Sequence, residues 1–150
     1  MTKYGGKYRI VIIPGDGVGP EMMHHVRESF KAVRAPIEFE EVPLNSKTVT
    51  DSLLDQAVLA VRRNGACLKG NIETDHNSPT APSVNLLLRR RLDLFANVLR
   101  CKTLPNIKTR HTDVDILVIR ENTEGEYSSL EHESVPGVVE SLKIITQEKS

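Results

Sequence analysis

The residues best suited to chemistry are a serine, an asparagine and an arginine that follow Pro82. Asn85 and Arg89 are four positions apart, so on a helix they share one face. Ser83 precedes them at the position of an N-cap, beside backbone N–H groups that have no partner within the helix. Helix N-termini attract anions because these groups and the helix dipole both favour negative charge. The spacing therefore predicts a site for a small anion.

A second pair, Arg120 and Tyr127, follows an apolar run that predicts a buried strand. Charged and aromatic residues at such strand ends are where α/β enzymes place their chemistry. Arginine offers a planar fork of donors to a carboxylate, and tyrosine is a candidate general acid. With the first three residues they suit a small polycarboxylate. Structural roles are the alternative: Arg120 could pair with Glu121 or Asp113, and Tyr127 could pack a loop.

These side chains need a scaffold, and the N-terminal part of the chain has the pattern of a strand, a glycine-rich loop and a helix. The β-branched run at 8–13 predicts a buried strand, and apolar spacing after Pro20 predicts a helix to about Arg34. The loop between them reads G-x-G-x-G rather than the dinucleotide motif G-x-G-x-x-G. We therefore favour a tight turn that needs positive φ over a phosphate cradle.

The remaining elements alternate between helix and strand. We predict strands at 37–42, 66–69, 94–101, 115–119 and 137–146, helices at 50–65 and 83–92, a polar loop at 70–82 and the start of a helix at 147–150. This order predicts an α/β fold with a mixed sheet flanked by helices. We expect residues 1–150 to form one partial domain, the N-terminal half of a larger fold, that does not bury a complete core alone.

Composition excludes several classes of protein. The 150 residues are 39% apolar and 27% charged, with 20 basic and 20 acidic side chains, as in globular proteins without a general affinity for nucleic acid. The basic run at 89–91 has no interleaved aromatic residues, so a solvated helix edge explains it. No apolar run reaches the roughly 18 residues that would indicate a membrane span, and no signal peptide or presequence is visible.

Cysteine and histidine residues give no sign of a metal centre. Cys67 and Cys101 lie far apart in apolar, strand-like settings, so we predict reduced core residues. His24 and His25 are adjacent, and on a helix their side chains would point about 100° apart, which suits no shared metal ion. We expect no metal site within this chain.

Several segments together resemble the isocitrate and isopropylmalate dehydrogenase family. They are I-P-G-D-G-V-G-P-E, S-V-N-L-L-L-R, D-L-F-A-N-V, I-R-E-N-T-E-G-E-Y and L-K-I-I-T, and the resemblance extends over residues 4–150. The segment R-E-N-T-E-G-E-Y is highly specific. Within the family, G-N-I-E-T-D-H-N and Y-S-S-L-E-H-E-S are most similar to the gamma-type, regulatory subunits of mitochondrial NAD-dependent isocitrate dehydrogenases.

The resemblance implies a pocket in which a serine, an asparagine, three arginines and a tyrosine hold isocitrate. All but the middle arginine have a counterpart at Ser83, Asn85, Arg89, Arg120 and Tyr127. Leu99 stands where the middle arginine is expected, and Arg100 follows one position later. A one-residue shift turns a strand side chain to the opposite face, so Arg100 should not replace the missing contact. Its loss would weaken binding at least about tenfold.

By resemblance, the complete enzyme would oxidise isocitrate to 2-oxoglutarate and CO2 in the mitochondrial matrix, with NAD and Mg²⁺ or Mn²⁺. The regulatory type would hold citrate in the old substrate pocket, with ADP near Asn71 and Thr74, and would activate a catalytic, alpha-type subunit. Thr74-Asp75 replaces the Thr-Pro step of catalytic members. We expect no ligand to be bound fully by these residues. Two alternatives are an active dehydrogenase, with Tyr127 as general acid, and a purely structural subunit.

Overall fold

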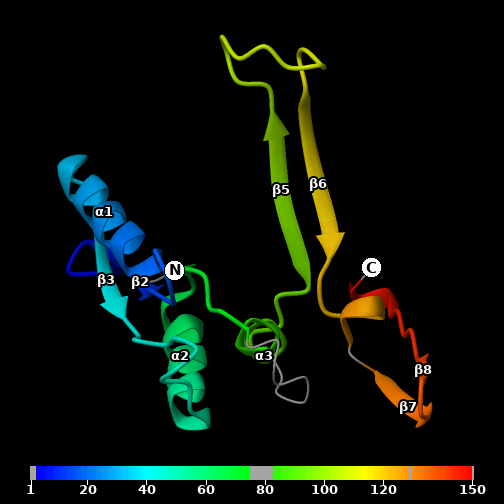
Figure 1. Ribbon diagram of the computed structural model, residues 1–150. Coiled ribbons are helices and arrows are strands. Elements are labelled where there is room, and N and C mark those ends of the chain that lie inside the picture. The colour runs from blue at the N-terminus through cyan, green and yellow to red at the C-terminus, as the bar shows by residue number, and fades with distance from the viewer. Residues whose placement is uncertain (1–2, 75–82, 129, 150) are drawn as a thin grey trace. The chain divides into compact units, whose positions relative to one another are not determined.

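The computed structural model describes residues 3–74, 83–128 and 130–149, and the chain divides into two units, residues 1–92 and 93–150. Residues 75–82 of the predicted polar loop, including Asp75, lie outside the described residues. The first unit contains β1 (Lys3–Tyr4), β2 (Lys7–Ile13), α1 (Gly19–Ala32), β3 (Ile37–Glu41), α2 (Asp51–Asn64), β4 (Cys67–Lys69) and α3 (Val84–Arg91) (Figure 1).

Strand β2 is the centre of the sheet in the first unit. It pairs in parallel with β3 and with β4, and β1 adds an antiparallel pair at its start. Val11 and Ile12 are fully buried and Ile13 is 1% exposed, as expected for an apolar strand between two neighbours. The buried strand at 8–13 and the mixed sheet are therefore confirmed.

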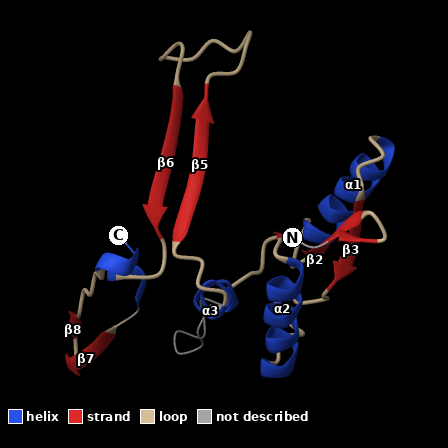
Figure 2. Ribbon diagram, turned by 180° about the vertical axis from the view of Figure 1, so that it is seen from behind, coloured by secondary structure: helices blue, strands red, loops and turns tan. Residues whose placement is uncertain are grey.

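Helix α2 packs its apolar face onto this sheet (Figure 2). The Thr50 side chain accepts a hydrogen bond from Leu53 N at 3.2 Å, and Gly65 ends the helix with φ of 79°. Both are ordinary helix signals, because the cap satisfies a free N–H and glycine adopts positive φ without strain. Leu54 and Ala57 are 1% and 0% exposed and join the core, and the helix predicted at 50–65 is confirmed.

The glycine-rich loop after β2 packs against the segment that follows β4. Gly15 has φ of 74°, and a Cβ there would lie 2.1 Å from the Asn71 carbonyl oxygen. A Cβ on Gly70 would lie 2.0 Å from the Pro14 carbonyl oxygen. The glycines are thus required by a tight turn and a close approach of two backbones, which confirms the turn interpretation.

The second unit consists of two antiparallel strand pairs and short 3₁₀ turns. Its elements are β5 (Ala96–Lys102), β6 (Asp115–Glu121), η1 (Gly125–Ser128), β7 (Glu131–Val135), β8 (Val138–Ser141) and η2 (Gln147–Lys149). Strand β5 pairs with β6, and β7 pairs with β8. None of the helices in the described part of the chain has the length and apolar character needed to cross a membrane.

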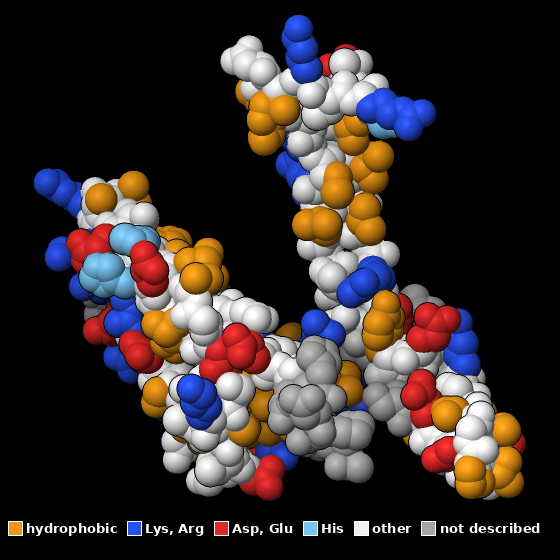
Figure 3. Space-filling model, in the orientation of Figure 1, with side chains coloured by type: hydrophobic (Ala, Val, Ile, Leu, Met, Phe, Trp, Pro, Cys, Tyr) orange, Lys and Arg blue, Asp and Glu red, His pale blue; other side chains and the backbone are white. Residues whose placement is uncertain are grey.

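Burial in the second unit differs from the prediction. The apolar side chains of β5 and β6 are exposed, including Val98 at 58% and Ile119 at 68% (Figure 3). The prediction of a buried strand at 115–119 is therefore wrong for this chain. Among the described residues of 93–150, those classed as buried are Asn122, Thr123 and Gly125. Among the described elements of the second unit, none forms a second layer over the two-stranded ribbon of β5 and β6, which accounts for the exposure of its apolar side chains.

Two further details correct the sequence interpretation. Cys101 is exposed rather than part of a core, whereas Cys67 is half-buried, and both are free. The strand predicted at 137–146 is shorter than expected, because β8 ends at Ser141, and it forms a hairpin with β7, a strand that was not predicted. Every residue of β7 is exposed, including His132, so a polar sequence is compatible with a strand there.

Candidate functional site

Asn85 ties the start of α3 to the segment after β4. Its Nδ2 donates to the Ile72 carbonyl oxygen at 2.8 Å, and its Oδ1 accepts from Lys69 Nζ at 2.8 Å. The side chain thus has partners on both of its polar atoms and is held in one orientation. Asn85 therefore connects α3 to residues outside its own helix.

Ser83 occupies the predicted N-cap position of α3, but its hydroxyl does not cap the helix. Instead the hydroxyl lies 3.0 Å from the Thr74 hydroxyl. A residue predicted for the carboxylate pocket therefore touches one predicted for the effector region. Any ligand that moves one hydroxyl changes the hydrogen bonding of the other.

Lys69, at the end of β4, is a site residue that the sequence interpretation missed. Its Nζ donates to Asn85 Oδ1 and to the Gly70 carbonyl oxygen at 2.7 Å. Burial lowers the pKa of the Lys69 ammonium group, and the nearby charge of Arg89 acts in the same direction. The rule that singled out Arg120, a charged residue at a strand end, would also have found Lys69.

The segment after β4 and the start of α3 border a hollow of about 480 Å³. Its lining residues are Asn71, Ile72, Glu73, Thr74 and Asn85. Both predicted effector residues and one residue of the predicted carboxylate pocket thus face the same space. Amide, hydroxyl and carboxylate groups there suit a ligand that makes several hydrogen bonds.

Asp16, in the glycine-rich loop, holds this segment in place and was also missed. Its carboxylate accepts from Glu73 N at 2.9 Å, and from Ser46 N and Ser46 Oγ at 3.0 Å each. Its own N–H donates to the Asn71 carbonyl oxygen at 2.6 Å. Burial raises the pKa of Asp16, but the hydrogen bonds from Glu73 and Ser46 outweigh it and lower the pKa below its usual value.

Arg120 and Tyr127 lie together in the second unit. The Arg120 guanidinium is 5.3 Å from the centre of the Tyr127 ring, within the range of a cation–π contact. Both border a hollow of about 340 Å³ that also includes Lys143. The Glu121 carboxylate accepts hydrogen bonds from Thr123 N at 2.6 Å and Glu124 N at 2.8 Å, which accounts for its side chain without a pair to Arg120.

The register of β5 and β6 decides where Leu99 and Arg100 point. Asn97 lies opposite Arg120 and Leu99 lies opposite Val118, so Leu99 shares a face with Arg120. Arg100 is on the other face, where its Nε and Nη2 reach the two Asp115 carboxylate oxygens at 2.8 and 2.6 Å. The prediction that Arg100 points to the strand face opposite that of Leu99 is confirmed.

The predicted site residues thus form two groups, one in each unit. Ser83, Asn85 and Arg89 are on or beside α3 in the first unit, and Arg120 and Tyr127 are in the second. Among the described residues, no group of three or more His, Cys, Asp or Glu side chains could hold a metal ion. The described residues therefore do not provide the cluster of carboxylates that a divalent cation site needs.

Comparisons with known proteins identify relatives along nearly all of the chain. The chain is 58% identical to the gamma subunits of mitochondrial NAD isocitrate dehydrogenase from Bos taurus and Homo sapiens, over 99% of its length and 38% of theirs. It is 50% identical to subunit 1 of the mitochondrial NAD enzyme of Schizosaccharomyces pombe, over 99% of its length and 43% of that protein's. The chain therefore spans less than half the length of these relatives.

Solved structures of two related enzymes have the same fold. An isocitrate dehydrogenase from Methylococcus capsulatus aligns with a TM-score of 0.78 at 29% identity, over 95% of this chain and 44% of that one. A beta-decarboxylating dehydrogenase from Thermococcus kodakarensis aligns with a TM-score of 0.67 at 30% identity, over 95% of this chain and 42% of that one. The sequence pattern of one family matches residues 9–150. The chain belongs to the isocitrate/isopropylmalate dehydrogenase family.

Proposed function

We propose that this chain is part of a gamma-type, regulatory subunit of a mitochondrial NAD-dependent isocitrate dehydrogenase. The identity of 58% to subunits of that name supports this. In the assembled enzyme, a catalytic, alpha-type partner would oxidise isocitrate to 2-oxoglutarate and CO2 in the matrix. NAD and Mg²⁺ or Mn²⁺ would serve that partner's reaction. The chain described here would bind a regulatory ligand.

The ligand we propose is citrate or a closely similar polycarboxylate. Ser83, Asn85, Arg89, Arg120 and Tyr127 would bind it through hydroxyl, amide and guanidinium groups. Guanidinium groups bind carboxylates well, because their two parallel N–H bonds match the geometry of the carboxylate. Asn71 and Thr74 would line the adjacent effector region, where ADP would bind. The contact between the Thr74 and Ser83 hydroxyls, 3.0 Å apart, gives the two ligands a physical connection.

The observation that carries the regulatory role is the place of Leu99 on the strand face of Arg120. An apolar side chain there offers no donor to a bound carboxylate, and each lost charge-assisted hydrogen bond costs about 1.5–3 kcal/mol. That loss weakens binding at least about tenfold. Hydride transfer requires closer alignment than binding does, so catalysis would suffer more than affinity. A pocket of this kind retains recognition and loses turnover.

The experiment is calorimetric titration of citrate into the complete gene product, assembled with its catalytic partner. Arg89→Ala and Arg120→Ala should each weaken citrate binding at least about tenfold. Arg110→Ala is the matched control, because Arg110 is exposed and lies in neither pocket. Citrate affinity that is the same in all three variants would contradict the proposed site.

Restoring the missing arginine tests the argument from Leu99. Leu99→Arg should raise isocitrate affinity at least about tenfold, since it returns a guanidinium to the face of Arg120. Arg100→Ala should leave that affinity unchanged, because Arg100 points to the other face and binds Asp115. Equal effects of the two substitutions would show that the face of the strand does not matter.

The same protein distinguishes the two alternatives. NADH formation without a catalytic partner, abolished by Tyr127→Phe, would indicate an active dehydrogenase in which Tyr127 acts as general acid. No shift in melting temperature with citrate, ADP or isocitrate would indicate a purely structural subunit, because a ligand that binds the folded state must stabilise it.

A further inference from the structure

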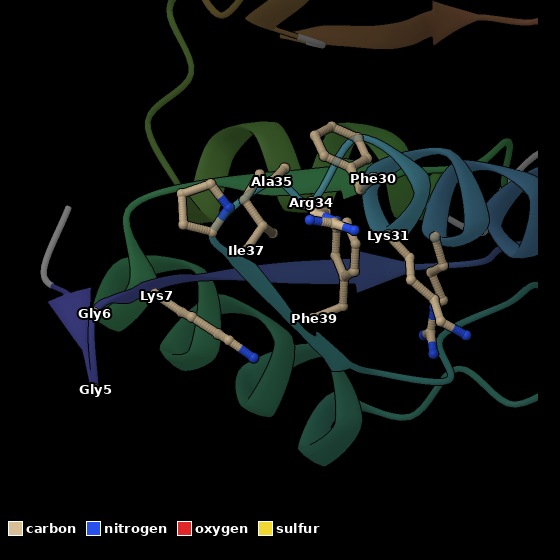
Figure 4. A pocket seen from close by; sticks show the side chains of 11 residues that line it. Gly5, Gly6, Lys7, Phe30, Lys31, Arg34, Ala35, Ile37 and Phe39 are labelled. Carbon is tan, nitrogen blue, oxygen red and sulfur yellow. The ribbon is translucent and has the colours of Figure 1, made fainter.

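A hollow of about 580 Å³ lies in the first unit, between the C-terminal half of α1, the start of β3 and the turn before β2 (Figure 4). Its lining residues are Gly5, Gly6, Lys7, Arg27, Phe30, Lys31, Arg34, Ala35, Pro36, Ile37 and Phe39. None of them belongs to the carboxylate pocket or the effector region. We propose that this hollow binds a small organic anion that combines a phosphate group with a planar ring.

Positive charge is concentrated here although the chain as a whole is neutral. Four lining residues are basic and none is acidic. Arg27 pairs with Glu41 outside the lining, and Lys31 makes a loose contact of 3.9 Å with Glu28. Among the described residues, no ion pair joins an acid to Lys7 or Arg34. Such a group of cations around one hollow attracts an anion.

Aromatic side chains form part of the wall. Phe30 and Phe39 meet edge to face, with ring centroids 5.7 Å apart, and Phe30 is 36% exposed. An exposed ring beside several cations can stack on or contact a flat apolar group while the cations hold its charged end. The ligand class that matches both features is an aromatic phosphate rather than a free inorganic ion.

The backbone at Arg34, on one side of the hollow, adopts a strained conformation. Arg34 has φ of 51°, a conformation that suits glycine at a helix end. Its N–H donates to the Lys31 carbonyl oxygen at 3.0 Å, and Ala35 N donates to the Phe30 carbonyl oxygen at 3.0 Å. Tyr8 N then bonds the Pro36 carbonyl oxygen at 2.8 Å. These backbone hydrogen bonds hold this side of the hollow in place.

The dipole at the C-terminal end of α1 does not account for all four basic residues of the hollow. Lys31 is the basic residue of its last turn, which is where a cation offsets the helix dipole. Lys7 comes from a different element, β2, and Arg34 follows the helix in a strained conformation. The helix dipole therefore does not explain the presence of Lys7 and Arg34 beside the hollow, and these two residues are the ones to substitute.

The test is calorimetric titration of 1-naphthyl phosphate and of pyrophosphate into the complete gene product. Lys7→Gln combined with Arg34→Gln should weaken naphthyl phosphate binding at least about tenfold. Lys108→Gln combined with Arg110→Gln removes the same charge from exposed residues outside the hollow, and should have little effect. Phe30→Leu should weaken binding of naphthyl phosphate and leave that of pyrophosphate unchanged. Equal affinities in the two double variants, or no binding of either probe, would overturn the proposal.

Arg34→Gly separates a ligand-binding role from a structural one. Glycine adopts a positive φ without strain, so the melting temperature should rise by about 2 °C or more. Binding of naphthyl phosphate should fall, because the guanidinium is lost. A structural role for Arg34 would give the opposite result, a lower melting temperature with unchanged binding. This variant also keeps the test decisive if the double variant does not fold.

Discussion

Replacing Asp16 with alanine should release the segment after β4 and lower the free energy of unfolding. The Asp16 carboxylate is partly buried and accepts from three donors, Glu73 N, Ser46 N and Ser46 Oγ. Hydrogen bonds to charged groups contribute about 1.5–3 kcal/mol each where water is excluded. Because the site is partly open and the freed donors regain water, we expect a combined loss of about 2–4 kcal/mol.

The effect of Asp16 should depend on pH in a defined direction. Its hydrogen bonds hold the pKa of the folded state below the ordinary value. A carboxyl group with a depressed pKa contributes its full stability above the unfolded value of about 3.9, and loses it as pH falls through the folded value. The difference between wild type and Asp16→Ala should thus be constant near neutral pH and shrink in acid.

Urea unfolding at pH 7 and pH 3, with hydrogen exchange at the Glu73 amide, would measure both effects. Asp55→Ala is the matched control, because Asp55 is an exposed acid whose carboxylate pairs with Arg91 at 2.5 Å. It should change the unfolding free energy by no more than about 1 kcal/mol. The reasoning fails if Asp16→Ala has as small an effect as Asp55→Ala, or if protection of the Glu73 amide is unchanged.

Three further outcomes can be measured. Gly15→Ala should lower the unfolding free energy by at least about 2 kcal/mol, since its Cβ would lie 2.1 Å from the Asn71 carbonyl oxygen. Gly6→Ala, whose Cβ would have no atom within 4 Å, should cost about 1 kcal/mol, and equal costs for the two variants would contradict this. Thr50→Ala should cost about 1 kcal/mol in thermal unfolding through the lost cap to Leu53 N, and a neutral result would rule out that contribution. Burial raises the pKa of Cys67 to about 11, so its alkylation by iodoacetamide at pH 8, followed by mass spectrometry, should be roughly a hundredfold slower than that of an ordinary thiol; fast labelling that Cys67→Ser abolishes would argue against burial.

The first unit follows closely from its sequence because its signals are local. Thr50 and Gly65 mark the two ends of α2, and the pattern of apolar residues between them selects the buried face. A cap or an αL glycine acts within one helical turn, so neighbouring residues are enough to predict it. The run at 8–13 likewise predicts a buried strand, because Arg9 is its one charged residue and strands covered on both faces have nearly continuous apolar sequences.

Long-range contacts could not be predicted in this way. Asp16 bonds Glu73 N across 57 positions of sequence, and no local pattern specifies which backbone meets that carboxylate. Burial also depends on residues far away in the sequence. The apolar composition of β6 is typical of a buried strand, but Ile119 is exposed because no other described element of the second unit packs on it. The hairpin at 131–141 was missed for a related reason, because alternation between apolar and polar residues is weak where both faces meet water.

Leu99 shows how a single position can be interpreted from sequence once the local geometry is certain. Residues 94–101 were predicted to form a strand, and β5 includes both Leu99 and Arg100. Because side chains alternate along a strand, moving an arginine by one position is equivalent to removing it from that face. The Arg100 guanidinium forms a bidentate pair with Asp115, which holds it on the face opposite that of Leu99. In the regulatory role proposed above, a pocket without this guanidinium would bind a carboxylate but would not align it for reaction.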